Sequence, residues 1–366
     1  MRALFMLASL SLAACAPRTE IHQPFGEDTP LPRGSLAEAR LDTAVVLHMA
    51  RQIDQNEHEL HSLLVVRDGK LVFDRYYHGH TRETPHDLRS ATKSITALLT
   101  GIAIAEGHLA GPDQPVMDVL RAAYPDVRGN DGITLRHLLT MRSGLDCYDG
   151  DRRTRGQEDR MYRSRDWTRY FLALDAPYAP GDTTRYCTGG VVALGEAIRL
   201  ASGEDAAAFA DRTLFAPMGI RNYRWARYDE GRKVDTGGHL LLTPEGLAKV
   251  GLLVMDEGRW EGRPLVPADW VREATAPHTT LAGGDYGYLW RIYRVPMPNG
   301  GPEVEVLVAH GNGGQALFLA PAYDLLMVTT AGYYNRAEAD AVPFQLFFNA
   351  VLPSIDELRP YAGPPE

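Results

Sequence analysis

The chain has 366 residues, of which 45% are hydrophobic and 23% charged, so it can bury a substantial core and is not disordered as a whole. Its formal net charge of −9 at pH 7 argues against nucleic acid as a partner, because phosphate binding needs a basic face. No segment repeats at a period of about 20–50 residues, which argues against a solenoid or a propeller.

The first element in chain order is a targeting segment rather than part of the fold. Arg2 is followed by the apolar run Ala3–Leu12, which is shorter than the about 20 residues of a membrane-spanning helix and is typical of a secretory signal peptide. Leu12-Ala-Ala-Cys15 resembles the bacterial lipoprotein box, which implies removal of residues 1–14 and lipidation of Cys15. An ordinary signal peptide with a chance cysteine is the alternative. Residues 15–35, polar and rich in proline, are expected to form a lipidated tether.

The globular part is predicted to start with a helix and a hairpin. A helix is expected within 36–55, and two apolar runs, Ser62–Arg67 and Lys70–Tyr77, are joined by Asp68-Gly69, the strongest short hairpin signal. Ser90–Glu106 is predicted as a helix, since its apolar residues recur at helical spacing before Gly107. Later helices are expected at 134–141, 190–201, 242–256, 267–274 and 339–352, and strands at 303–309, 316–320 and 325–330.

Strands are therefore expected at both ends of the chain and helices in its middle. Short turns join consecutive strands, so the two ends should pair in one antiparallel sheet packed with helices. We expect a single α+β domain over 36–355, with a sheet lobe at about 36–85 and 285–355 and an all-helical lobe at about 86–284, followed by a tail at 356–366. A cleft between the lobes is the natural ligand site.

The first motif that could carry chemistry is Ser90-Ala-Thr-Lys93, at the start of the best predicted helix. Residues i and i+3 lie on one helix face, so hydroxyl and amine project together. The positive helix N-terminus and burial would lower the pKa of Lys93, and its neutral amine could then take the serine proton. The Ser90 amide could serve as one oxyanion donor. A capping serine beside a solvated lysine is the alternative, but a lysine in the first turn opposes the macrodipole.

Two further motifs lie on predicted loops. Tyr186-Cys-Thr-Gly-Gly190 precedes a helix, and a tyrosine there can point into a cleft and relay protons with a lysine; a ring packed on the core is the alternative. His310-Gly-Asn-Gly-Gly-Gln315 separates two strand-like runs, where glycines mark the close approach of a backbone or ligand. A glycine-rich hairpin turn is the alternative for this motif.

In this order, the three motifs resemble the serine β-lactamase and penicillin-binding-protein superfamily. The closer resemblance is to its class C-like branch of esterases, D-amino-acid peptidases and 6-aminohexanoate-dimer hydrolases. The resemblance implies a β-lactamase/transpeptidase-like fold and a catalytic site without a cofactor. Ser90 would be the nucleophile that forms an acyl-enzyme, and Lys93 and Tyr186 would share the role of general base. The similarity spans roughly 63–330 and includes the segments Leu135–Asp146, Tyr186–Gly195, Gly237–Gly246 and Gly311–Gln315.

Two departures from the family pattern bear on the substrate. The second motif usually reads Tyr-x-Asn, whereas this chain has Thr188, which cannot present an amide to a substrate carbonyl. The third motif usually begins Lys-Thr-Gly, whereas here His310 is a weaker, pH-dependent cation for a substrate carboxylate. Esters, short amides or cell-wall-type peptides are therefore expected, rather than efficient turnover of β-lactams. The candidate substrate-binding and oxyanion residues are Thr188, His310, Asn312 and Gly313 to Gln315.

Cys147 and Cys187 each lie beside a segment that the family fold brings to the cleft. Export would place both in an oxidising compartment, and with Cys15 lipidated they are the two cysteines left. We expect a Cys147–Cys187 disulfide; two buried thiols are the alternative. Ala16 after Cys15 resembles the outer-membrane sorting pattern of Gram-negative bacteria, so the predicted location is the periplasmic face of the outer membrane.

Histidine clusters suggest a competing metal site. His58 and His61 lie three residues apart, and His78-Gly-His80 follows a predicted strand. A hydrolytic zinc site needs three ligands and an open position, the chain has no His-Glu-x-x-His, and a third ligand would be arbitrary, so we expect no catalytic metal. Glu158-Asp-Arg160 lies in a polar loop that could line the cleft, although a solvated loop is the expected reading.

The sequence thus favours an exported serine hydrolase that acts on a small ester, amide or cell-wall peptide and meets the membrane only through its anchor. A catalytically inert penicillin-binding-protein-like module, which binds a ligand or a partner protein, is the alternative. Thr188 and the altered third motif motivate that alternative. Lys93 counts against it, because a binding module has no reason to keep Ser-x-x-Lys at a helix N-terminus. A metal-dependent hydrolase is the third reading.

Overall fold

An eight-stranded antiparallel sheet lies at the centre of the computed structural model, which describes residues 21–22, 26–296 and 303–358. The sheet has the order β10-β11-β12-β13-β14-β15-β2-β3. Its strands are β2 (Leu60–Arg67), β3 (Lys70–Tyr76), β10 (Thr279–Leu281), β11 (Gly284–Tyr286), β12 (Arg291–Val295), β13 (Val304–Gly311), β14 (Gln315–Ala320) and β15 (Leu325–Ala331). The predicted signal peptide, Cys15 and residues 359–366 of the tail lie outside the described residues.

The two ends of the chain pair in this sheet, as the sequence predicts. Strand β15 is antiparallel to β2, with Leu325 opposite Arg67 and Thr329 opposite Leu63. The β2–β3 hairpin turns at Asp68-Gly69, where both residues have positive φ, as a type I′ turn requires. Fold class and hairpin are therefore both confirmed.

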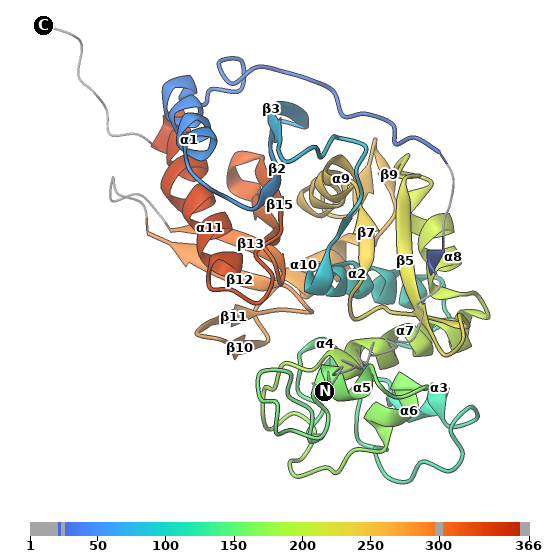
Figure 1. Cartoon of the computed structure of the whole chain (residues 1–366). Coiled ribbons are helices and arrows are strands. Elements are labelled where there is room, and N and C mark those ends of the chain that lie inside the picture. The colour runs from blue at the N-terminus through green and yellow to red at the C-terminus, as the bar shows by residue number, and fades with distance from the viewer. Residues whose placement is uncertain (1–20, 23–25, 297–302, 359–366) are drawn as a thin grey trace, which may run out of the picture.

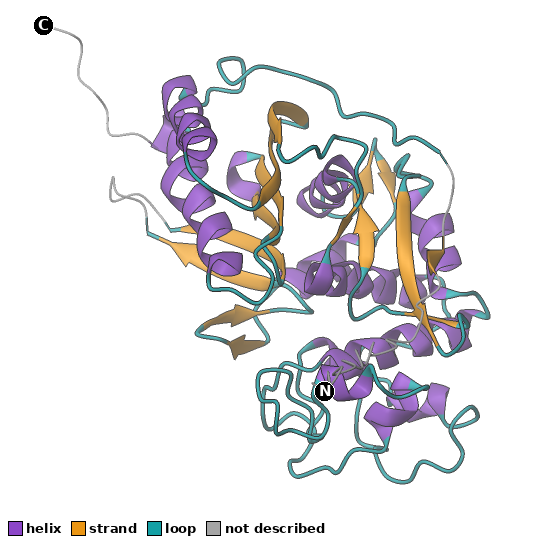
Figure 2. Ribbon diagram, in the orientation of Figure 1, coloured by secondary structure: helices purple, strands orange, loops and turns teal. Residues whose placement is uncertain are grey.

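Helices cover both faces of the sheet (Figure 2). Alternate strand residues point to opposite faces, so Leu64 and Leu317 join one core and Leu63 and Phe318 join the other. The first core packs against the helices α2, α9 and α10, and the second packs against α1 and α11 (Figure 1). These helices are α1 (Thr43–Gln55), α2 (Thr92–Ala105), α9 (Pro244–Met255), α10 (Ala268–Thr275) and α11 (Glu338–Leu346).

Four short helices and the 15-residue α7 form a lobe at one end of the molecule, at the bottom of Figure 1. They come from the middle of the chain and are α3 (Val116–Leu120), α4 (Leu135–Leu139), α5 (Glu158–Met161), α6 (Trp167–Leu172) and α7 (Thr188–Ser202), with α8 (Ala206–Ala210) following. Helix α7 ends at Gly203, whose φ of 73° is the left-handed conformation that closes many helices. No helix among the described residues is long and apolar enough to cross a membrane.

The middle of the chain also contains strands, so the prediction of an all-helical lobe there is wrong in this respect. A second sheet has the order β1-β5-β7-β4, with β6 paired to β5. Its strands are β1 (Ile21–His22), β4 (His86–Asp87), β5 (Tyr223–Tyr228), β6 (Lys233–Val234) and β7 (Leu240–Leu242), and a separate pair joins β8 (Arg259–Trp260) to β9 (Arg263–Pro264). Strand β4 matters most for function, because it leads directly into the Ser90 segment.

The second half of the predicted tether packs on the domain instead of hanging free. Leu31 is buried, and its N–H donates to the carboxylate of Glu245 at 3.0 Å. The carboxylate of Asp28 accepts from the backbone N–H groups of Arg221 and Asn222 at 2.6 and 2.8 Å. The domain therefore begins before residue 36, and the prediction of a tether that extends to residue 35 is too long.

Candidate active site

Ser90 lies in a short 3₁₀ turn, Arg89–Ala91, that runs directly into α2. The preceding residue, Arg89, has a φ of 49°, a conformation that costs a non-glycine residue about 1 kcal/mol. This conformation is held in place because the Arg89 N–H donates to the carboxylate of Asp87, on β4, at 2.9 Å. Strand β4 thus fixes the backbone from which the serine hydroxyl projects.

The structure brings the Ser90, Lys93 and Tyr186 side chains together. Lys93 is almost fully buried, and its Nζ donates to Ser90 Oγ at 3.1 Å and to the carbonyl oxygen of Gly237 at 2.5 Å. The same Nζ lies 5.1 Å from the centroid of the Tyr186 ring. Helix spacing places serine and lysine on one face, and the loop before α7 supplies the tyrosine.

The charges around Lys93 differ from the sequence expectation. Burial disfavours the ammonium form, but the opposite charges of Tyr186 when ionised and of Glu158, Asp149 and Asp235 outweigh it, so the pKa of Lys93 is raised. The prediction of a lowered lysine pKa is therefore wrong. Lys93 carries its proton at neutral pH, and its ammonium orients the Ser90 hydroxyl by donating to it.

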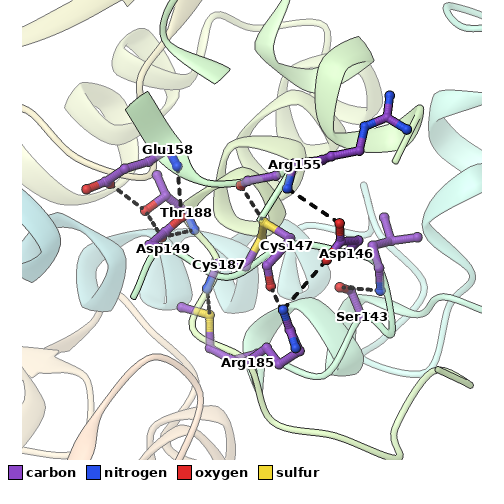
Figure 3. Close-up of a disulfide and its surroundings, with 12 residues drawn as sticks. Ser143, Asp146, Cys147, Asp149, Arg155, Glu158, Arg185, Cys187 and Thr188 are labelled. Carbon is purple, nitrogen blue, oxygen red and sulfur yellow. Dashed lines mark hydrogen bonds and ion pairs between the residues drawn. A yellow bond between two sulfur atoms is a disulfide. The ribbon is translucent and has the colours of Figure 1, made fainter. Parts of the chain in front are cut away.

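A disulfide and an acidic pair organise the loop around the second motif (Figure 3). Cys147 and Cys187 are bonded, as the sequence predicts. Thr188 is fully buried, its hydroxyl donates to Asp149 at 2.8 Å, and the same hydroxyl oxygen lies 3.1 Å from a carboxylate oxygen of Glu158. Thr188 therefore holds the two carboxylates near Lys93 rather than facing solvent, and Glu158 belongs to the site instead of a solvated loop.

The backbone of β13 passes directly beside the serine segment. A Cβ atom added to Gly311 would lie 2.1 Å from the carbonyl oxygen of Leu88 and 3.1 Å from the amide nitrogen of Ser90. Only glycine permits this approach. The third motif thus reaches the site through its backbone, and it forms the hairpin turn between β13 and β14.

His310 points away from Ser90, which contradicts its expected role in holding a substrate carboxylate. Neighbouring residues of a strand project to opposite faces, and Gly311 faces the serine segment. The His310 ring instead lies against α11, with its Nε2 3.1 Å from Asp340 and its ring centroid 5.9 Å from that of Phe344. Burial lowers the pKa of His310, so it does not act as a cation at neutral pH.

The other residues of the third motif have structural partners. The Asn312 side chain donates to Asn335 at 2.9 Å, and Gln315 is buried and donates to the backbone carbonyl of Ala331 at 2.6 Å. Gly313, with a φ of 99°, lies in the turn itself. The roles of Asn312 and Gln315 as substrate ligands, and of the Gly313 amide as the second oxyanion donor, stay predictions.

Sequence reasoning missed Asp149 and Asp235 as parts of the site. Asp235 is fully buried, and its carboxylate accepts from the Gly237 N–H at 3.1 Å, beside the carbonyl that binds Lys93. Neither aspartate stands in a recognisable motif, so no local signal could have singled them out. A cavity of about 750 Å³ lies elsewhere, lined in part by Leu31, Lys249 and Trp260, and none of Ser90, Lys93 and Tyr186 lines it.

Comparison with known proteins identifies the family and the fold. A family model described as Beta-lactamase matches residues 51–344. The chain is 26% identical over 299 residues to the 6-aminohexanoate-dimer hydrolase of Paenarthrobacter ureafaciens, covering 74% of this chain and 72% of that protein. Among solved structures, a Bacillus anthracis protein assigned as a 6-aminohexanoate-dimer hydrolase superposes with a TM-score of 0.74 at 16% identity, covering 93% of this chain and 92% of its own. A class C beta-lactamase variant superposes with a TM-score of 0.63 at 14% identity, covering 82% and 94%.

Proposed function

Because the chain belongs to the beta-lactamase family, we propose that it is a serine hydrolase that cleaves ester or linear amide bonds through an acyl-enzyme on Ser90. The contact between Lys93 Nζ and Ser90 Oγ, at 3.1 Å in a buried setting, carries this proposal. The curated relative is named a 6-aminohexanoate-dimer hydrolase, and that name motivates amides among the substrates. An inert binding module would gain nothing from a buried ammonium aimed at a serine hydroxyl.

In the proposed acylation, Ser90 Oγ attacks the substrate carbonyl carbon and its proton passes to Tyr186. Tyr186 is proposed to accept this proton as its phenolate, and it fits the role by position because the Lys93 Nζ that contacts Ser90 Oγ also lies 5.1 Å from the centroid of the Tyr186 ring. Collapse of the tetrahedral intermediate breaks the bond to the leaving alcohol or amine, which takes the proton back from Tyr186. Water then attacks the acyl-enzyme by the reverse sequence and releases the acid. The Ser90 amide and the Gly313 amide are the proposed oxyanion donors.

The substrate class follows from what surrounds the serine. His310 points away from the site, so the third motif offers no side-chain cation for the carboxylate of a β-lactam. We therefore propose esters and short linear amides, with cell-wall-type peptides as a further class, and poor turnover of β-lactams. Export and lipidation at Cys15 belong to the same proposal, and the Cys147–Cys187 disulfide supports export because such bonds persist in oxidising compartments.

A fluorophosphonate probe tests the nucleophile directly, with intact mass as the readout. We expect one adduct on the wild-type protein, no adduct on Ser90→Ala, and one adduct on Ser94→Ala. Ser94 is the matched control, because it lies four residues further on, in α2, and its hydroxyl donates to the carbonyl of Leu289. Nitrophenyl esters, a linear 6-aminohexanoate amide and a chromogenic cephalosporin then rank the substrates. Absence of an adduct on the folded protein, together with no hydrolysis of any of the three, would favour the inert binding module.

A further inference from the structure

Three histidine side chains from separate segments meet outside the catalytic site. His61 lies in β2, His80 follows β3, and His86 lies in β4. Their ring centroids are 4.0 Å apart for His61 and His80, 4.7 Å for His80 and His86, and 5.3 Å for His61 and His86. One ring nitrogen from each residue falls within 4.8 Å of the other two.

Two of these rings have a buried nitrogen without a partner. His86 Nδ1 lies 3.0 Å from the backbone carbonyl oxygen of Thr84. A carbonyl oxygen can only accept a hydrogen bond, so Nδ1 carries the proton and donates it, and Nε2 keeps its lone pair. That Nε2 atom and the Nδ1 atom of His61 are buried and form no hydrogen bond. A buried lone pair without a donor is unfavourable, and a cation would satisfy both.

We propose that His61, His80 and His86 form a binding site for a divalent transition-metal ion, with Zn²⁺ as the best-fitting ion. Imidazole nitrogens are preferred ligands of zinc, and three of them plus water complete a tetrahedral site. In a tetrahedral zinc site the ligand nitrogens lie about 3.4 Å apart. Here one nitrogen of each ring lies within 4.8 Å of the other two, so small rotations of the rings would bring the three nitrogens to that spacing. The His86–Thr84 hydrogen bond is the backbone contact that typically orients a metal-bound histidine.

The charged surroundings of His61 also fit a metal. The carboxylate of Glu59 is among the charges that act on His61, and it would favour a cation there.

Two further histidines lie beside the site but are engaged with each other. His78 Nε2 is 3.4 Å from His58 Nδ1, and that Nδ1 also accepts the N–H of Leu60 at 3.1 Å. Their removal should therefore leave metal affinity nearly unchanged, which makes His58 and His78 internal controls.

The site would be structural, because the serine machinery is complete without it. A metal would tie β2 and the turn after β3 to β4. In β4, Asp87 directly follows His86 and holds the Arg89 backbone before Ser90. Bound metal should therefore stabilise the segment that presents the nucleophile. This inference does not depend on which bond the serine attacks.

Metal binding is tested on the full-length protein without a histidine tag, stripped with a chelator and titrated with Zn²⁺ against a chromophoric competitor. We expect the wild type to bind one equivalent of Zn²⁺. The affinity should fall more than about 100-fold in each of His61→Ala, His80→Ala and His86→Ala. His80→Ala is the variant least expected to disturb the fold, because His80 lies in a half-exposed turn. His58→Ala, His78→Ala and the exposed α1 variant His48→Ala should bind like the wild type. Co²⁺ should give the intense visible absorption of a tetrahedral site.

A second readout separates binding from folding. Zn²⁺ should raise the urea midpoint of the wild type and leave that of His80→Ala unchanged. Weak binding of Zn²⁺ to the wild type, at a dissociation constant above about 100 μM, would overturn the proposal. Equal affinity of wild type and His80→Ala would also overturn it, because the metal would then lie elsewhere.

Discussion

Thr188 donates both its backbone N–H and its hydroxyl to one carboxylate oxygen of Asp149, at 2.7 and 2.8 Å. The N-cap residue of α7, Cys187, makes no side-chain hydrogen bond to the helix. The carboxylate of Asp149, from another segment, caps the start of α7 instead. It also holds a negative charge close to Lys93. Asp149 therefore serves the electrostatics of the site at a cost to stability, because burial disfavours its ionised form.

The Asp149→Asn variant should be more stable than the wild type above pH 6. Burial, followed by the charge of Glu158, raises the pKa of Asp149 from 3.8 to about 6. Between those values the folded state binds the proton more tightly than the unfolded state, so wild-type stability falls as pH rises through this window. We expect the variant to gain about 3 kcal/mol at pH 7.5 and little near pH 4, measured by urea unfolding. An equal gain at both pH values would show that charge is not the cause.

Lys93→Met should retain the fold and lose activity. The variant removes the buried ammonium that orients Ser90 Oγ, and a positioned proton-transfer network contributes about 10²–10⁴-fold to a rate. We expect a loss of this size in kcat for ester hydrolysis and in the rate of fluorophosphonate labelling. Lys249→Met is the matched control, since Lys249 is equally buried but donates to the carbonyl of Met218. Similar losses in both variants would argue against a specific role for Lys93.

Loss of the disulfide should weaken both stability and catalysis. The bond closes a loop with a sequence separation of 40, and chain entropy assigns such a crosslink about 4 kcal/mol. Cys147→Ala/Cys187→Ala should lower the free energy of unfolding by about this amount, and reduction of the wild type should lower it similarly. Because Cys187 follows Tyr186 directly, we also expect a lower kcat. Unchanged unfolding in a reductant would mean that the bond does not form in solution.

Gly311→Ala should impair catalysis more than folding. The new Cβ would lie 2.1 Å from the carbonyl oxygen of Leu88, so β13 and the Ser90 segment must separate. A shift of about 1 Å in a catalytic group can cost 10²-fold in rate. The control is Gly284→Ala in β11, where the added Cβ finds its nearest atom at 3.6 Å. Full activity of Gly311→Ala would show that this backbone is not part of the site.

The sequence predicted those features that local patterns specify. The Asp68-Gly69 hairpin and the helix predicted at 190–201, observed as α7, follow from turn chemistry and local sequence pattern alone. The orientation of His310 could not be predicted, because a one-residue error in the assumed register of a strand moves every side chain to the opposite face of the sheet. The second sheet was missed because four of its five strands, β1, β4, β6 and β7, have only two or three residues, too few to show a period.

Long-range electrostatics explains the other errors. The raised pKa of Lys93 depends on Asp149, Glu158 and Asp235, which come from three places far from Lys93 in the chain. The third histidine of the proposed metal site, His86, lies six residues after His80 and shares no spacing rule with His61. In both cases the fold, and not a motif, selects the partners.

The pairing of β2 with β15 also constrains how the chain reaches its folded state. The register joins Leu63 to Thr329, so a strand made early during synthesis finds its neighbour only when nearly the whole chain is available. The interior edge of β2 therefore stays unpaired while the ribosome adds the intervening residues, and contacts of this sequence separation form slowly. If the chain is exported as proposed, such a delay would keep it unfolded for translocation. The same pairing means that any truncation before β15 removes a central strand of the sheet.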